Sequence, residues 1–151
     1  MAVRFVADVM LGRLAKWLRI LGYDTHYQPF YQEPVMNQYV KEGRLLLSRH
    51  RSITEHYTKS FLIKADTVKN QLYEMRNSNY IKSARSMWLT RCMICNLPLQ
   101  KVTPETVRDI IPEYVFNQNH KDFRFCGSCK RYFWPGSHRD RILNQLKIWG
   151  F

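Results

Sequence analysis

Apolar and polar residues alternate in two different patterns along the first half of the chain. Short apolar runs of the kind that forms strands occupy residues 3–7, 45–48 and 61–64, and residues 25–27 (THY) are a further strand candidate. Stretches in which apolar residues recur every three or four positions, as in amphipathic helices, occupy residues 10–21, 33–42 and 67–76. Strands that alternate with helices predict an α/β domain, in which helices flank a parallel sheet.

The first predicted helix has a basic face opposite its apolar stripe. Arg13, Lys16 and Arg19 take this face, and we expect the helix to end at Gly22. A basic helix face can hold the phosphates of a nucleic acid, and a face that is merely solvated is the alternative.

Four cysteines occur as two pairs, CMIC at 92–95 and CGSC at 126–129. Each CxxC turn points two thiolates at one centre, and two such turns complete a tetrahedral zinc site with no open coordination position. Disulfides are the alternative, but they are uncommon inside cells. We therefore predict a four-cysteine zinc ribbon with structural zinc bound by Cys92, Cys95, Cys126 and Cys129.

The cysteine pairs also indicate the domain organisation. We expect the α/β domain over residues 1–80, a linker over 81–90, and the zinc ribbon with a short C-terminal helix over 91–151. Trp88 in the linker and the aromatic residues 132–134 could stack on unpaired bases. Aromatic residues beside a zinc site also pack its small core, which is the alternative.

The charge of the chain points to a polyanionic partner. Lys and Arg number 24 against 12 Asp and Glu, a net charge of +12, and the excess is spread over both halves. A folded basic surface attracts nucleic acid, although general solubility would also account for the charge. No apolar run reaches the roughly 18 residues of a membrane span, and the N-terminus lacks the apolar stretch of a secretory signal. We expect a cytoplasmic protein without membrane contact.

Ionisable residues follow three of the predicted strands. Asp8 follows the first strand, His50 lies two residues past the third, and Asp66 lies two past the fourth. Sites in parallel sheets form at the carboxyl ends of the strands, so these groups are expected to gather at one edge. Converging carboxylates bind Mg²⁺ or Mn²⁺, which can activate water against a phosphodiester. Each aspartate has a simpler alternative, because Asp8 could cap the first helix and Asp66, with Thr67, a later one.

Several stretches are distinctive: FVADVMLGRLAKWLRILGYDT (5–25), EGRLLLSRHR (42–51), ADTVKNQL (65–72), RCMICNLPL (91–99) and CGSCKRYFWPGSH (126–138). Together they resemble the Mut-seven C-terminal RNase domain family over nearly the whole chain. The resemblance implies a PIN-like α/β nuclease domain followed by a zinc ribbon. It also implies an acidic cluster that holds Mg²⁺ or Mn²⁺ to cut single-stranded RNA.

The resemblance also assigns roles to individual residues. Asp8 and Asp66 match acidic positions of the family and would hold the catalytic divalent ion, and Glu33 falls near a further acidic position. Where the family has Thr-Arg-Asp, residues 48–50 are Ser-Arg-His, so His50 replaces a metal-site aspartate. Imidazole is a better ligand for Mn²⁺ than for Mg²⁺. His50 could instead act as a general base or contact a phosphate.

We therefore predict a metal-dependent endoribonuclease that acts on single-stranded RNA. Its catalytic residues would be Asp8, Glu33, His50 and Asp66, and its RNA contacts Arg13, Lys16, Arg19, Arg49 and Arg51. A catalytically silent module that binds RNA or a ribonucleoprotein is the alternative. A toxin-like protein with a small acidic partner protein also fits a PIN-like fold.

Overall fold

The structure is a computed structural model of the chain, and it describes residues 2–118 and 122–151. The chain forms two compact units, Met1–Asn96 and Leu97–Phe151. Within the described ranges, no helix combines the length and apolar character needed to cross a membrane.

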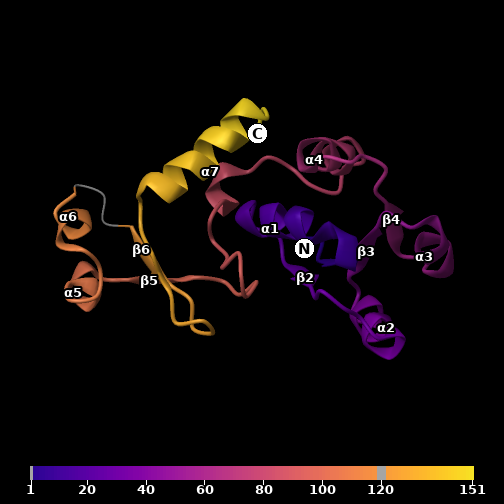
Figure 1. Cartoon of the computed structure of the whole chain (residues 1–151), viewed down its shortest axis with the longest axis horizontal. Coiled ribbons are helices and arrows are strands. Elements are labelled where there is room, and N and C mark those ends of the chain that lie inside the picture. The colour runs from indigo at the N-terminus through magenta and orange to yellow at the C-terminus, as the bar shows by residue number, and fades with distance from the viewer. Residues whose placement is uncertain (1, 119–121) are drawn as a thin grey trace. The chain divides into compact units, whose positions relative to one another are not determined.

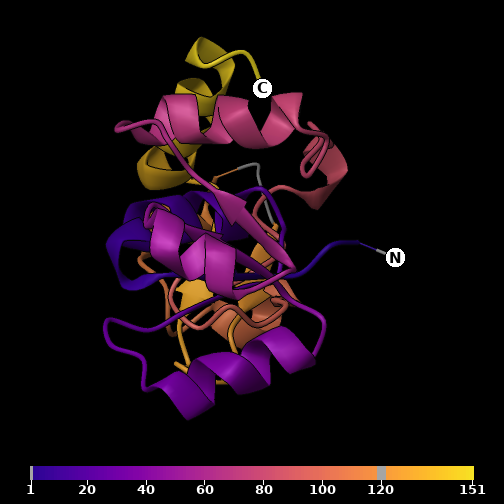
Figure 2. The same ribbon diagram turned by 90° about the vertical axis from the view of Figure 1, so that its right-hand side faces the viewer.

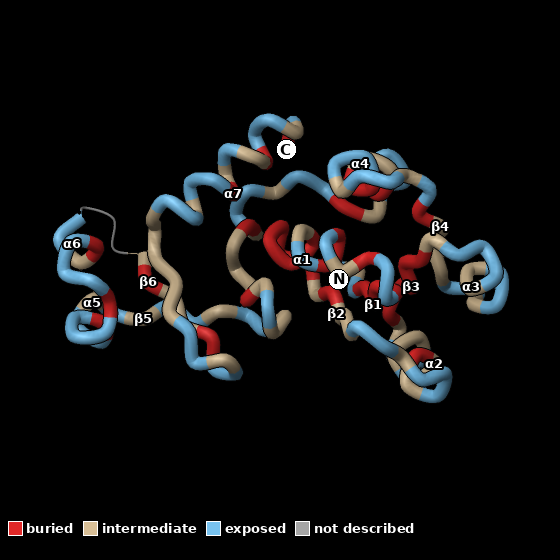
Figure 3. Tube along the Cα trace, viewed as in Figure 1, coloured by how far each residue is buried: buried red, intermediate tan, exposed pale blue. Residues whose placement is uncertain are grey.

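Four short parallel strands form the sheet of the first unit: β1 (Phe5–Ala7), β2 (Thr25–Tyr27), β3 (Leu45–Ser48) and β4 (Ser60–Leu62). Their order across the sheet is β2-β1-β3-β4; Figure 1 labels β2, β3 and β4, and Figure 3 also labels β1. The central strands β1 and β3 are buried along their whole length, which accounts for the continuous apolar runs FVA and LLL (Figure 3).

Helices follow each strand of this sheet: η1 (Val9–Leu11) and α1 (Gly12–Ile20), α2 (Glu33–Lys41), α3 (Arg51–His56), and α4 (Val68–Asn77) with η2 (Arg85–Met87). The helices α2 and α4 lie on opposite sides of the sheet (Figures 1 and 2). Met36 of α2 packs on Val6 and Leu46 of the central strands in one core cluster. Both faces of the sheet are therefore covered, as parallel sheets require.

Most of the elements lie where the apolar pattern predicts them. The strands at 25–27 and 45–48 coincide with β2 and β3, and Gly22 and Gly43 follow α1 and α2 with φ of 98° and 92°. Helix α3 is missed by the sequence analysis, because none of its six residues is buried and no apolar stripe marks it. The fourth strand ends at Leu62 and not at the predicted residue 64.

The segment at 81–90, predicted as a linker, packs on the first unit. Ile81 and Trp88 are buried, and the Leu89 amide donates to the Ile20 carbonyl at the end of α1 over 2.8 Å. The backbone of Met87 lies so close to Gly22 that a Cβ there would be 2.4 Å from its carbonyl oxygen. Trp88 is buried in the core of the first unit, which favours packing over base stacking for this ring. Whether residues 1–80 fold alone stays a prediction.

The second unit contains a small antiparallel sheet with the order β5-β6-β7 (Gln100–Val102, Phe123–Phe125 and Tyr132–Phe133). Its helices are α5 (Pro104–Val107), α6 (Glu113–Phe116) and α7 (Ser137–Ile148). Its core cluster contains Val107, Ile111, Val115 and Phe123, with Tyr132 and Trp134 packed against it. These two aromatic residues therefore pack the core, which was the alternative to base stacking.

The predicted fold class is confirmed. The chain has a mixed α/β structure with a four-stranded parallel sheet flanked by helices, and it carries a cluster of four cysteines that could bind zinc.

Candidate functional site

The carboxyl ends of β1 and β3 bring two of the four predicted catalytic residues, Asp8 and His50, to one edge of the sheet. Ala7 is opposite Leu47 in the β1–β3 pairing, and Ser48 is opposite Leu62 in the β3–β4 pairing. Asp8, Ser48 and the turn that carries His50 therefore come next to one another. Asp66 is further away along the chain than predicted, four residues past the end of β4 and not two.

Asp8 is held in a fixed orientation. It is 5% exposed, its Oδ1 accepts from the Val9 amide over 2.8 Å, and its Oδ2 accepts from the Ser48 hydroxyl over 2.8 Å. Asp8 thus caps η1, as the simpler alternative predicted, and also joins β1 to β3 at the sheet edge. Each carboxylate oxygen has two lone pairs, so the group keeps capacity to accept a further proton or cation.

Two tyrosines that sequence reasoning missed secure the backbone on both sides of Asp8. The Tyr31 hydroxyl donates to the Ala7 carbonyl over 2.9 Å, and the Tyr27 hydroxyl donates to the Val9 carbonyl over 2.8 Å. Burial raises the pKa of Tyr31 well above its ordinary value, and the charge of Asp8 adds to the effect. The Tyr31 hydroxyl therefore remains a donor. Their positions in the sequence could have indicated this role. Tyr27 is the last residue of β2, the strand beside β1, and Tyr31 lies in the segment that follows it.

His50 lies at the N-terminal boundary of α3, exposed to solvent. Its amide donates to Ser48 Oγ over 3.0 Å, and its carbonyl accepts from the Ile53 and Thr54 amides. The backbone of His50 is thus fixed by the strand end and the helix start. Because the residue is exposed, its imidazole is accessible to a bound molecule.

The other two acidic candidates lie on the surface. Asp66 accepts from Arg49 Nη2 over 2.5 Å, and its side chain is 86% exposed. It does not cap α4, because Thr67 does so by accepting from the Asn70 amide. Glu33 is the exposed first residue of α2, as predicted.

The four predicted catalytic residues do not form a preformed metal site. In the described part of the chain, the one group of three or more metal-binding side chains with ligand atoms within 4.8 Å is the cysteine cluster. The arrangement of Asp8, Glu33, His50 and Asp66 therefore does not fit a bound Mg²⁺ or Mn²⁺ as it stands, and no catalytic step follows from such an ion.

The predicted basic contacts divide into exposed and buried residues. Arg13, Lys16 and Arg51 are exposed, and Arg49 is partly exposed. Arg19 is only 8% exposed, so it does not lie on the exposed face of α1 to which the sequence analysis assigned it. Residues three positions apart are displaced by about 60° around a helix axis. Arg19 comes six residues after Arg13, so it lies roughly 120° from Arg13, beside the apolar stripe.

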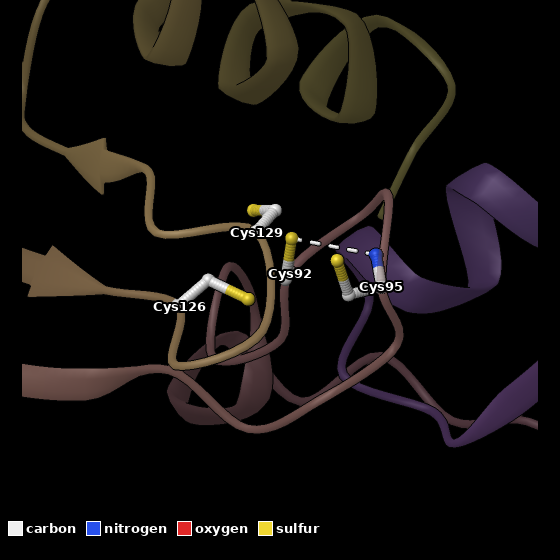
Figure 4. A group of neighbouring side chains, drawn as sticks. All are labelled: Cys92, Cys95, Cys126 and Cys129. Atoms are coloured by element: carbon white, nitrogen blue, oxygen red, sulfur yellow. Dashed lines mark hydrogen bonds between the residues drawn. The ribbon is translucent and has the colours of Figure 1, made fainter.

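The four cysteine sulfurs lie within 4.8 Å of one another (Figure 4). A tetrahedral zinc ion with metal–sulfur bonds of about 2.3 Å needs sulfurs roughly 3.8 Å apart, which this cluster can supply with small side-chain adjustments. The chemistry of the donors, four thiols, is also that of a structural zinc site. The cysteines are therefore positioned to bind a metal ion.

The two CxxC turns have the same backbone geometry. The Asn96 amide donates to the Cys92 carbonyl over 2.8 Å, and the Lys130 amide donates to the Cys126 carbonyl over 2.9 Å. Both Asn96 and Lys130 have positive φ, of 64° and 60°. In the first turn, the Cys95 amide also donates to Cys92 Sγ over 3.4 Å. Gly127 does not need this left-handed conformation, so the glycine of CGSC is not what shapes the turn.

The first cysteine turn is tied to the parallel sheet by buried polar groups. Arg19 donates through Nε to the Thr25 carbonyl over 2.9 Å, and through Nη1 to the Met93 and Ile94 carbonyls, each over 3.0 Å. Burial lowers the pKa of Arg19, while the nearby Cys92 sulfur raises it. Arg19 is thus a structural link between α1, β2 and the residues between Cys92 and Cys95.

Asn96 completes this link. Its Oδ1 accepts from the Thr25 amide over 2.9 Å, and its Nδ2 donates to Asp24 Oδ1 over 2.7 Å. Asp24 also pairs with Arg44 Nη1 over 2.7 Å. Burial alone would raise the pKa of Asp24, but the hydrogen bonds from Arg44 and Asn96 lower it below its ordinary value. The carboxylate therefore stays charged within the network.

Comparison with known proteins identifies one family. The family model described as the Mut7-C RNAse domain matches residues 3–146. No curated protein and no solved structure matches the chain.

Proposed function

The chain belongs to the Mut7-C RNAse domain family, and from this premise we propose that it is an endoribonuclease that acts on single-stranded RNA at the carboxyl edge of its parallel sheet. The family indicates a nuclease-like role related to RNA. The observation that carries the proposal is the Asp8 carboxylate, fixed at that edge by Val9 and Ser48. The net charge of +12 supports a polyanionic substrate.

Different residues at this edge can serve different roles in cleavage. Asp8 supplies a fixed carboxylate that can accept a proton from an attacking hydroxyl or water. Exposed Arg51 and partly exposed Arg49, on either side of His50, can bind phosphates. Dependence on Mg²⁺ or Mn²⁺ stays a prediction, because the carboxylates would first have to move together.

A catalytically silent RNA-binding module is the second candidate function. The separation of the acidic side chains favours it, as does His50 in place of an aspartate. Both candidates share the RNA surface, and they differ only in whether the bound phosphodiester is broken.

Cleavage assays separate the two functions. Purified protein is incubated with mixed unstructured and hairpin RNA in Mg²⁺, Mn²⁺ or a chelator, beside Asp8→Asn and the exposed control Asp109→Asn. An active wild type, with a rate that falls about a hundredfold or more in Asp8→Asn but not in the control, supports the nuclease. A wild type that binds RNA without cutting it in any condition supports the silent module.

His50→Asp refines this test. If the missing carboxylate limits the activity, the variant gains activity or metal affinity, because the acidic set is restored. If the imidazole serves as a general base, His50→Asp loses activity instead. Circular dichroism of each variant shows whether the fold is kept.

We propose further that zinc binds Cys92, Cys95, Cys126 and Cys129 and supports folding. Four thiolates leave zinc no open position, so the metal supplies structural stability and no reaction chemistry. RNA is the proposed partner, and a ribonucleoprotein or small acidic partner protein stays a prediction, as does a cytoplasmic location.

A further inference from the structure

Three large apolar side chains are exposed at the carboxyl edge of the sheet. They are Val9, Met10 and Phe30, which are 37%, 56% and 70% exposed. Val9 and Met10 follow β1, and Phe30 follows the neighbouring strand β2. We name this set the apolar rim. Exposed apolar side chains are common singly, but three beside a candidate site indicate a binding surface.

The backbone that carries the apolar rim is anchored to the sheet. The Tyr27 hydroxyl donates to the Val9 carbonyl over 2.8 Å. The Tyr31 hydroxyl donates to the Ala7 carbonyl and accepts from the Gln28 amide, each over 2.9 Å. Phe30 therefore lies in a loop that its neighbour Tyr31 anchors to the end of β1. An exposed ring on an anchored loop is preorganised to receive a flat ligand.

The other half of the same edge is basic. Arg49 and Arg51 follow β3, and exposed Lys64 follows β4. Asp66, which also follows β4, pairs with Arg49, so Arg51 and Lys64 supply the excess positive charge. Because the strand order is β2-β1-β3-β4, the edge changes from apolar to basic across the sheet, with Asp8 at the end of β1 between the two halves. Adjacent strands lie about 4.8 Å apart, so the two halves are within the reach of one or two nucleotides.

Unpaired RNA is the ligand that matches both halves. It offers phosphates to basic side chains and free base faces to aromatic ones, whereas a duplex hides its base faces. We propose that the apolar rim binds an unpaired base, which stacks on Phe30, while Arg51 and Lys64 hold neighbouring phosphates. The inference rests on the proposed function, because it assumes that RNA lies along this edge. It adds that Phe30 selects single strands over duplexes.

The test compares Phe30 variants in RNA binding. Phe30→Leu keeps an apolar side chain without a ring, and Phe30→Tyr keeps the ring. Tyr114→Ala is the matched control, since Tyr114 is an aromatic residue of the second unit that is 72% exposed. Affinities are measured for a short unstructured RNA and for a hairpin. A single strand that carries 2-aminopurine reports stacking directly through quenching of its fluorescence.

We expect Phe30→Leu to weaken single-strand binding about tenfold and to abolish the quenching, as the loss of one base–aromatic stack predicts. Phe30→Tyr and Tyr114→Ala should bind as the wild type does, and hairpin affinity should not change. Equal losses for single strand and hairpin, or no loss in Phe30→Leu, would overturn the inference and leave the apolar rim as a protein-binding surface. A wild type that binds no RNA would overturn the proposed function as well, so the two failures are distinguishable.

Discussion

Ser48 donates its hydroxyl hydrogen to Asp8 Oδ2 over 2.8 Å, across the ends of two neighbouring parallel strands. Ser48 Oγ itself accepts from the His50 amide over 3.0 Å. Ser48 is fully buried, so water cannot replace either bond. One hydroxyl therefore orients the carboxylate after β1 and the turn after β3, and the two halves of the sheet edge are coupled through it.

Ser48→Ala should destabilise the protein and disturb Asp8. The substitution leaves the buried Asp8 carboxylate and the His50 amide with one partner fewer, which costs about 1–3 kcal/mol of unfolding free energy. Urea unfolding of Ser48→Ala is compared with that of Ser52→Ala, an exposed serine of α3. Equal stabilities of the two variants would contradict the role of the Ser48 hydroxyl.

Purified protein should contain about one zinc ion per chain, and Cys95→Ser or Cys126→Ser should lose it. Without its metal, the second unit has little core to keep it folded, because it is small and its sheet has only short strands. Metal analysis measures zinc, and far-ultraviolet circular dichroism measures the loss of structure. Ser128→Ala, at an exposed serine of the second CxxC turn, is the control and should keep both the zinc and the secondary structure. Protein that contains no zinc and has paired disulfides would refute the assignment.

Arg19→Gln should weaken both the fold and the metal centre, whereas Arg13→Gln on the same helix should change neither. Loss of the guanidinium leaves the carbonyls of Met93 and Ile94 without their donor, at a cost of about 2–3 kcal/mol. It also removes a cation beside sulfurs that become negatively charged when they bind zinc. Chelator competition should show faster zinc release from Arg19→Gln. An unchanged release rate, with a lower melting temperature, would limit Arg19 to a role in folding.

Stability should fall on mild acidification because of His26. Burial lowers the pKa of His26, against a hydrogen bond to Gln28 that raises it. The unfolded chain, with a histidine pKa of about 6.5, then takes up protons more readily than the folded chain. The stabilising contribution of His26 is therefore complete above that pH and is lost as the pH falls through the folded pKa.

Unfolding curves between about pH 7.5 and pH 5 measure this effect. His26→Gln should flatten the pH dependence, whereas His56→Gln, at an exposed histidine of α3, should keep it. If both variants follow the wild-type curve, another group governs the loss of stability.

Local patterns in the sequence determined the main elements and the cysteine cluster. Periodicity depends on which face of an element is buried, so it located β2, β3, α1 and α2, and the paired CxxC spacing identified all four cysteines of the cluster. These features can be recognised from residues that are close together in the sequence. Helix α3 was missed for the same reason, since a short helix with no buried residue leaves no apolar pattern to detect.

Only the tertiary structure decided how the charged residues are used. Arg13 and Arg19 look alike in the sequence, yet Arg19 is buried because β2 and the first cysteine turn, distant along the chain, provide carbonyls for its guanidinium. Asp8 and Asp66 were equally plausible strand-end carboxylates, but Asp8 is buried against Ser48, whereas Asp66 is on the surface beside Arg49. Burial of a charge depends on whether remote parts of the chain supply its partners, and sequence spacing does not carry that information.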